Sequence, residues 1–173
     1  SGAYVLALGH SARDSFEMLS DKISMENKNF AVGFRIEHKR ETINNAQYNG
    51  KNTDIEGSIL PAASYNLSYN DKKNGLSAYT FCMCPGGYVV NASSEEEMTC
   101  VNGMSYHARN GENSNSAIIA TVGEEIYGRE LLDGMRFQRK VEKKAYQLGK
   151  GSVPVQRFID YKNNRTSESY GSI

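Results

Sequence analysis

The feature that most constrains this chain is a proline and two glycines placed between two runs of β-prone residues in the segment 81–90. Before the break, Tyr79, Phe81 and Met83 alternate with smaller residues, which is the period of a half-buried strand. Pro85 to Gly87 then removes a backbone donor, permits positive φ and leaves two positions without side chains. The chain must turn here, either as an ordinary hairpin or as a turn that a ligand can approach closely.

Strand-like and helix-like runs alternate irregularly along the rest of the chain, and this defines the expected fold class. Alternating or apolar runs predict strands at 4–8, 30–38, 64–70, 78–84, 88–90, 99–101 and 117–122. Amphipathic spacing predicts helices at 12–23, 41–48 and 137–148, with a helical turn at 124–127. Short strands with long polar connections favour an α+β domain: a mixed, largely antiparallel β-sheet or partial barrel with about three flanking helices.

The first predicted strand, 4–8, is a nearly continuous apolar run, which is typical of a strand buried on both faces. It leads through Gly9 and His10 to Ser11, which is placed to cap the following helix. The free N–H groups at such a helix start suit an anion or a phosphate. An ordinary strand-to-helix connection has the same sequence, and no glycine triplet of the dinucleotide-binding kind is present.

The second predicted strand alternates so regularly that it also predicts which side chains face the core. Val32, Phe34 and Ile36 are expected to point inward. Arg35 and Glu37 are expected to point outward into solvent. One buried and one solvated face are therefore expected.

Less regular segments complete the organisation of the chain. The segment 50–58 has the composition of a mobile loop, and the three glutamates within 93–98 predict an acidic surface turn. Gly149 is expected to end the longest helix. The segment 152–160 is expected to be extended, and 163–173 is expected to be a frayed tail.

Composition excludes several classes of function. The 20 Lys and Arg residues balance the 20 Asp and Glu residues, so nothing favours nucleic acid or an anionic membrane as a partner. No apolar run approaches membrane-spanning length. Three cysteines, an odd number without a secretory signal, favour reduced thiols over a disulfide framework. We therefore expect a cytoplasmic protein.

The cysteines offer two further hypotheses. Cys82 and Cys84 are two residues apart on a predicted strand, which would place both thiols on one side of it. Such a pair is either a redox dithiol or two small core residues. Adding Cys100 and His107 would supply four zinc ligands, but the spacing matches none of the usual zinc patterns. No metal site is expected.

A donor-rich polar stretch follows the proposed turn. Asn102 to Arg109 contains Tyr106 and His107, and the asparagine-rich run 110–116 continues the polar character. His107, His10 and His38 are the only histidines, so a general base is most readily sought among them. The asparagines, Asn113 among them, suit either a polar small ligand or an ordinary turn.

Five stretches together resemble a known family. They are Leu6 to Leu19, Phe30 to His38, Phe81 to Val90, Asn102 to Arg109, and Val153 to Arg157. Across nearly the whole chain, these stretches are similar to bacterial FAD-dependent dehydrogenases or oxidoreductases of undefined substrate. The chain resembles the middle part of such a protein, an inserted domain that lies over the flavin on the substrate side.

The resemblance implies how this chain relates to a longer parent. Residues 1–23 would form a strand, turn and helix of the flavin-binding part, 24–162 the inserted substrate-side domain, and 163–173 a flexible tail. The parent would bind FAD, whereas this chain, which lacks the glycine fingerprint, would bind none alone. Its partners would be the remaining FAD-binding halves of the same polypeptide and a small-molecule substrate, with no nucleic acid and no membrane.

The resemblance also suggests site residues. Those near the cofactor would be Gly9, His10, Ser11, Arg13, Gly86 and Gly87. The catalytic candidates are His107 or His10 as proton donor and Arg109 as anchor for an anionic substrate. Substrate contacts would come from Asn102, Tyr106, Arg109 and Asn113. Two alternatives remain open: a free-standing binding or interaction module, and a dithiol redox domain that uses Cys82 and Cys84.

Overall fold

The structure is a computed structural model that describes residues 2–9, 11–50 and 60–168. Its helices are α1 (Arg13–Leu19), α2 (Arg40–Tyr48), α3 (Glu124–Tyr127), α4 (Asp133–Leu148) and α5 (Phe158–Lys162). Its strands are β1 (Phe30–Lys39), β2 (Ser68–Asp71), β3 (Leu76–Cys84), β4 (Gly87–Asn91), β5 (Val101–Ser105) and β6 (Asn113–Val122). The mobile loop predicted at 50–58 falls almost wholly outside the described residues.

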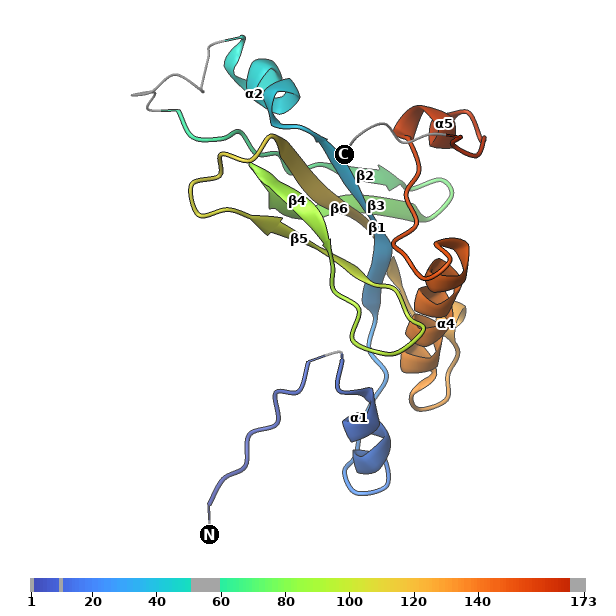
Figure 1. The fold of residues 1–173 in the computed structure, drawn as a ribbon. Coiled ribbons are helices and arrows are strands. Elements are labelled where there is room, and N and C mark those ends of the chain that lie inside the picture. Colours follow the sequence, from blue (N-terminus) through green and yellow to red (C-terminus); the bar gives the residue numbers. More distant parts are fainter. Residues whose placement is uncertain (1, 10, 51–59, 169–173) are drawn as a thin grey trace.

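Two antiparallel sheets form the centre of the molecule (Figure 1). The larger sheet has the order β1-β6-β3-β2, and β4 and β5 form a separate two-stranded sheet. This confirms the predicted α+β class with a largely antiparallel sheet, with five helices where about three were expected. Within the described residues the sheet does not close into a barrel.

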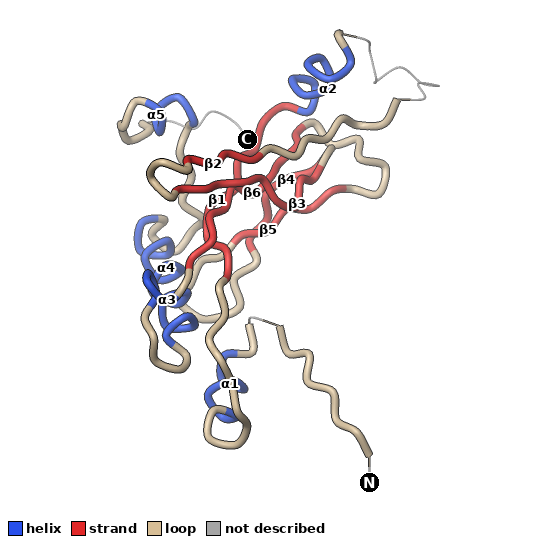
Figure 2. The backbone as a smooth tube through the Cα atoms, turned by 180° about the vertical axis from the view of Figure 1, so that it is seen from behind, coloured by secondary structure: helices blue, strands red, loops and turns tan. Residues whose placement is uncertain are grey.

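Local sequence signals account for several of these elements. β1 pairs with β6 over its whole length, from Phe30 opposite Val122 onward. The turn between β2 and β3 forms as predicted, because Asp71 Oδ1 accepts hydrogen bonds from the backbone N–H groups of the two residues that follow Lys72. α4 ends at Gly149, also as predicted. Figure 2 shows α3 and α4 together on one side of the sheet and α2 at the other end.

The proline and glycine break is a corner between the two sheets, and not a hairpin. β3 pairs with β2 and β6, whereas β4, which follows the turn directly, pairs with β5. A bulge between Phe81 and Cys84, with Cys82 at φ 45°, redirects β3 just before the corner. The chain therefore turns where the sequence predicts, but it passes into a different layer.

The predicted orientation of β1 is wrong for its charged residues. Arg35 Nη1 donates to Asn115 Oδ1 over 2.6 Å, and Glu37 Oε2 accepts from the Val89 backbone N–H over 2.6 Å. Both side chains are half-buried because the small sheet covers their face. Phe34, expected inside, is 48% exposed on the opposite face.

The polar stretch after β4 also differs from the expected loop. Its first residues form β5, and the asparagine-rich run supplies the first half of β6. Ser114, Asn115 and Ser116 are fully buried. Their hydrogen bonds to neighbouring strands and corners replace the solvent contacts that a loop would have.

The N-terminal segment does not form the predicted buried strand. Tyr4 and Val5 are 95% and 88% exposed, and within the described residues no strand pairs with this segment. It reaches away from the body of the molecule in both views (Figures 1 and 2). Ser11 is not the helix cap either, since α1 begins after Ala12 without a side-chain cap. An apolar run cannot become a buried strand without neighbours to pair with.

The C-terminal region is more ordered than predicted as far as Glu168, and the rest of the predicted tail, 169–173, lies outside the described residues. α5 occupies part of the segment expected to be extended. Ser167, within the expected tail, is buried, accepts a hydrogen bond from the Arg157 backbone N–H and donates one to Asp160 Oδ2. These bonds tie the chain back onto α5.

Aromatic packing fixes the helices on the sheet. The ring of Phe30 stacks on Tyr127 at 5.2 Å and meets Phe137 edge-on at 6.2 Å, which joins β1 to α3 and α4. Across the described ranges, no helix has the length and apolar character needed to cross a bilayer.

Candidate functional site

The corner after β3 and the loop after β5 lie against each other, backbone on backbone. Gly111 N–H donates to Gly86 O over 3.2 Å, and Ser105 Oγ donates to Pro85 O over 2.8 Å. A Cβ at Gly86, where φ is +58°, would lie 1.9 Å from Arg109 O. The structure thus brings together two of the stretches predicted near a ligand, with Gly86 and Gly87 buried beneath the loop.

The loop presents its side chains outward. Arg109 N–H donates to Tyr106 O over 2.9 Å, which closes a tight turn, and Tyr106 packs edge-on against Tyr88. The side chains of Tyr106, His107 and Arg109 are exposed. Within the described part of the chain Arg109 makes no ion pair. An imidazole and a guanidinium therefore stand in solvent on a fixed backbone.

The two candidate asparagines occupy different environments. Asn102 is exposed on β5 opposite Val90. Asn113 is half-buried, and its Nδ2 donates to Glu37 Oε1 over 2.7 Å, so one end of its amide is already engaged. Asn102 is free to meet a ligand at the surface, whereas Asn113 belongs to the layer between the sheets.

Arg35 is a polar residue at this site that the sequence did not single out. Its Nη1 donates to Asn115 Oδ1, and both Nη atoms donate to Cys82 O over 3.2 Å. Gly103 leaves room for this contact, because a Cβ there would lie 2.3 Å from Arg35 Nη1 and would displace the end of that side chain. Asn115 Nδ2 is buried without a partner. Strand alternation placed Arg35 on the face of β1 that was expected to be solvated. It did not indicate that the sheet of β4 and β5 would cover that face.

A second, larger polar cluster joins α1, the acidic turn and α4. Arg13, only 1% exposed, binds Glu142 through Nη2 to Oε1 at 2.5 Å and also pairs with Glu95. Arg139 contacts Glu95 Oε1 at 2.8 Å and Glu17 at 2.5 Å. We call these five residues the ionic cluster. Glu95 is thus part of a network, although the sequence predicted a plain surface turn there.

The pKa values of the ionic cluster follow from its contacts. The hydrogen bonds from Arg139 and then Arg13 lower the pKa of Glu95 to about 2. The bond to Glu142 is the main cause that raises the pKa of Arg13. Arg13 and Glu95 are therefore charged at neutral pH, and the Arg13 guanidinium is held between the carboxyl groups of Glu95 and Glu142.

The candidate residues near the N-terminus do not meet the loop after β5. Gly9, with φ +68°, has open space around it, and Ser11 is exposed. His10 lies outside the described residues. α1 and the loop after β5 are at opposite ends of the molecule in Figures 1 and 2. The chain by itself therefore separates the cofactor-side candidates from His107 and Arg109.

The thiols do not form a shared centre. Cys82 is exposed in the bulge, and Cys84 Sγ lies 3.3 Å from Cys82 O. Burial raises the pKa of Cys100, which lies apart at the start of β5. Among the described residues no group of three or more His, Cys, Asp or Glu side chains is arranged to hold a metal ion.

A half-buried histidine and tyrosine form another pair that the sequence did not predict. His38 Nε2 and Tyr65 Oη are 2.8 Å apart. Burial is the main cause that raises the pKa of Tyr65. The pair joins β1 to the segment that leads to β2, and the residues that follow His38 bond to Gly111 and Glu112 at the end of the loop after β5.

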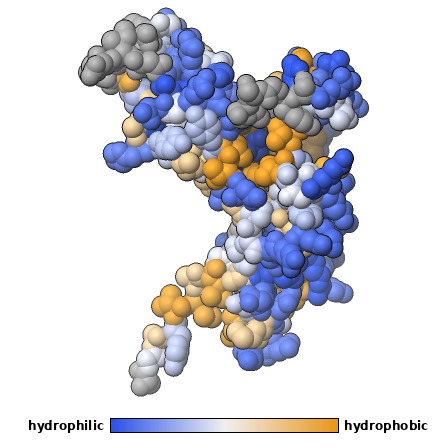
Figure 3. Space-filling view, in the orientation of Figure 1, coloured by the Kyte–Doolittle hydropathy of each residue, from blue (hydrophilic) through white to orange (hydrophobic). Residues whose placement is uncertain are grey.

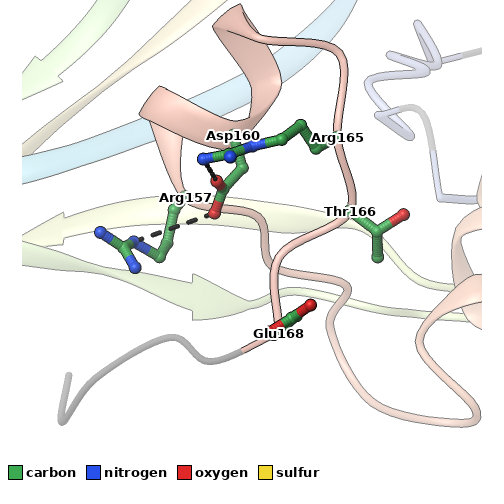
Figure 4. Close-up of a pocket in the computed structure, with 5 residues that line it drawn as sticks. All are labelled: Arg157, Asp160, Arg165, Thr166 and Glu168. Carbon is green, nitrogen blue, oxygen red and sulfur yellow. Dashed lines mark hydrogen bonds and ion pairs between the residues drawn. The ribbon is translucent and has the colours of Figure 1, made fainter.

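Figure 4 shows a cavity of about 310 Å³ beside α5, lined by Arg157, Asp160, Arg165, Thr166 and Glu168. Asp160 lies between the two arginines, with Arg165 Nη2 at 2.8 Å and Arg157 Nε at 4.0 Å. The hydrogen bond from Ser167 is the main cause that lowers the pKa of Asp160. Two arginines thus face two carboxylates, which leaves no excess positive charge for an anion.

Three of the cofactor-side candidates offer no open pyrophosphate site within the described residues. A dinucleotide needs backbone N–H groups or free cations at its pyrophosphate. Gly86 lies against the loop after β5, Gly87 pairs with Ser105 of β5, and Arg13 is neutralised by Glu95 and Glu142.

Comparisons with known proteins identify the family. Residues 29–173 match the family model described as "FAD-dependent protein, C-terminal domain-like". The chain is also 47% identical over 175 residues to a protein of Clostridium beijerinckii that is described as uncharacterized. That match covers 99% of this chain and 32% of the relative, so the chain spans about a third of the relative's length. The chain belongs to the family of FAD-dependent protein C-terminal-like domains.

Proposed function

We propose that this chain is the substrate-side domain of a FAD-dependent oxidoreductase and works as a dehydrogenase together with the rest of its polypeptide. Family membership supports a flavoprotein, and the length of the relative supports a larger parent. The middle position within that parent is part of the proposal. When bound by the parent, FAD would supply the electron acceptor for substrate oxidation.

The observation that carries the proposed role is the exposed, backbone-fixed loop with His107 and Arg109. Arg109, without an ion pair in the described chain, would bind an anionic group of the substrate. His107 would take or give a proton on the substrate. Tyr106 and Asn102 would orient the substrate from the same side. The bond from Gly111 to Gly86 O holds this loop in place.

Residues 1–23 are proposed to belong to the flavin-binding part of the parent. The support is the exposure of Tyr4 and Val5, which have no covering neighbours in the described chain. Gly9 and Ser11 would then be on the cofactor side. Arg13 would fix α1 to the rest of this domain, and would not bind the cofactor directly.

The first test is the visible spectrum of the full-length Clostridium beijerinckii relative. A yellow protein whose colour is bleached by a small hydroxy- or amino-carboxylate supports the proposal. A protein that is colourless and takes up no added FAD overturns it.

The second test separates binding from proton transfer in the full-length polypeptide that carries this domain. Arg109→Ala should leave flavin bound and raise KM by about 10- to 100-fold, the value of one charge-assisted hydrogen bond. His107→Ala should mainly lower kcat. Arg136→Ala, on an exposed arginine of α4, is the matched control. Unchanged flavin reduction in both test variants would refute the assigned roles.

A further inference from the structure

The larger sheet has an apolar face that the described chain covers only in part. Paired residues share a face, so Phe34 lies beside Ile118, and Ile118 beside Thr80. Tyr69 pairs with Ala78, two residues from Thr80, and Leu67 bonds to Thr80. This outer face is opposite the one that carries Arg35 and Glu37. Its apolar members are Val32, Phe34, Ile36, Leu67, Tyr69, Leu76, Ala78, Ile118 and Ala120, and Asp71, Thr80 and Ser116 are its polar members.

The helices cover only the β1 side of the outer face. Tyr161 of α5 contacts Phe34, with ring centroids 5.8 Å apart. On the β2–β3 side, Leu67, Tyr69 and Leu76 are 62%, 65% and 63% exposed. Figure 3 views the molecule from the side of β4 and β5, so the outer face is on its far side; the apolar side chains visible there lie in a hollow of the upper half and along the N-terminal segment.

The exposed apolar surface on the β2–β3 side is the size of a monomer's largest apolar patch. If the aromatic value of about 150–250 Å² for a whole side chain is taken as the upper limit for each of the three residues, their exposures of 62%, 65% and 63% leave at most about 300–450 Å² exposed. Patches of about 300–600 Å² are often functional surfaces. The chain matches only 32% of its relative, so most of that polypeptide lies outside the match. In α+β domains a sheet face is normally covered by helices. The rest of the same polypeptide is thus the partner that could cover this face.

We propose that the β2–β3 half of the outer face is the surface on which the rest of the polypeptide docks, through the apolar face of a helix. Leu67, Tyr69 and Leu76 would be its anchors. A helix is about 10 Å wide, and strands are spaced about 4.8 Å apart, so one helix would cover β2 and β3. The inference rests on the proposed function only in that this chain is one domain of a longer polypeptide.

Thiol labelling in the full-length polypeptide tests this inference. Tyr69→Cys and Leu76→Cys are compared with Leu148→Cys, which replaces an exposed apolar residue at the end of α4 with 69% exposure. Labelling of each site by a maleimide is followed by peptide mass spectrometry and normalised to the rate in urea. If this surface were free, the three rates would agree within about threefold, whereas docking predicts about tenfold or greater protection at 69 and 76 alone.

Two outcomes overturn the inference. Equal labelling at all three sites shows that the face is free. Protection that disappears on dilution, together with a fall from dimer to monomer in light scattering, assigns the face to a second copy. Ile126→Cys, at 54% exposure, repeats the control if Leu148→Cys does not fold. The flavin spectrum of the same samples reports on the proposed function independently.

Discussion

Replacing Glu142 by Gln should release α1 from the body of the molecule. Apart from bonds to residues next to it in sequence, α1 is hydrogen-bonded to the described chain only through Arg13 and Glu17. Glu142 holds the buried Arg13 guanidinium with two bonds, of 2.5 and 3.0 Å. Glutamine keeps the shape but removes the charge, so Arg13 would retain only Glu95.

The free energy of unfolding that Glu142→Gln should remove can be bracketed by two known values. Losing one hydrogen bond to a charged group costs about 1.5–3 kcal/mol, and leaving a buried charge without a partner costs about 3–5 kcal/mol. Because Glu95 still neutralises Arg13, we expect about 2 kcal/mol for Glu142→Gln. Arg13→Met should cost about 3 kcal/mol or more, because it leaves Glu142, only 13% exposed, without its partner.

Hydrogen exchange followed by mass spectrometry measures this effect where it acts. A loss of about 2 kcal/mol should speed amide exchange in residues 13–19 by about 30-fold. The control is Arg136→Met, which breaks a pair with Asp133 on the same helix at 59% exposure. That pair should contribute less than about 1 kcal/mol and leave α1 unchanged. Equal exchange of α1 in both variants would refute the reasoning.

Three further outcomes are expected. The pKa of Glu95 is lowered from 4.5 to about 2 by folding, so the stabilisation of the folded state by Glu95 should be complete above about pH 4.5 and lost between pH 4.5 and about pH 2. Urea unfolding midpoints measured against pH test this, and midpoints that do not change over this range contradict it. Gly86→Ala should cost about 3 kcal/mol or more in urea unfolding because its Cβ meets backbone, whereas Gly75→Ala, with φ +67° but open space, should cost about 1 kcal/mol; equal costs would exclude the loop contact as the cause. A thiol reagent at neutral pH should modify exposed Cys82 faster than Cys100, whose pKa is raised by burial, and the reverse order would contradict this assignment.

Elements that depend on neighbours in sequence were predictable. The turn after Asp71, the end of α4 at Gly149 and the strand β1 each rest on local chemistry or periodicity. The side of β1 that faces inward was not predictable from periodicity alone. A second sheet, formed by β4 and β5 more than 45 positions later, covers the face of Arg35 and Glu37. Glu37 finds a partner there in Val89, whereas Arg35 bonds to Cys82 and Asn115 of the larger sheet.

The site was predictable to a similar extent. The corner with Gly86 and the loop with Arg109 were both identified as candidates, and they do contact each other. The ionic cluster was not identified, because Arg13 and Glu142 are 129 positions apart. Nothing in the local pattern of either residue points to the other, and only the packing of α4 beside α1 and the acidic turn brings them together.

The layer between the two sheets is rich in amides, hydroxyls and charges, and this should affect how stability changes with temperature. Among the described residues, the buried hydrophobic ones are Ala63, Val122 and Tyr127, while Ser114, Asn115 and Ser116 are fully enclosed. Hydration of apolar groups raises the heat capacity of unfolding and hydration of polar groups lowers it, against a typical value of about 2 kcal/mol/K for this length. The chain should therefore show a smaller heat-capacity change than its size suggests, and a stability curve that varies little between cold and warm conditions.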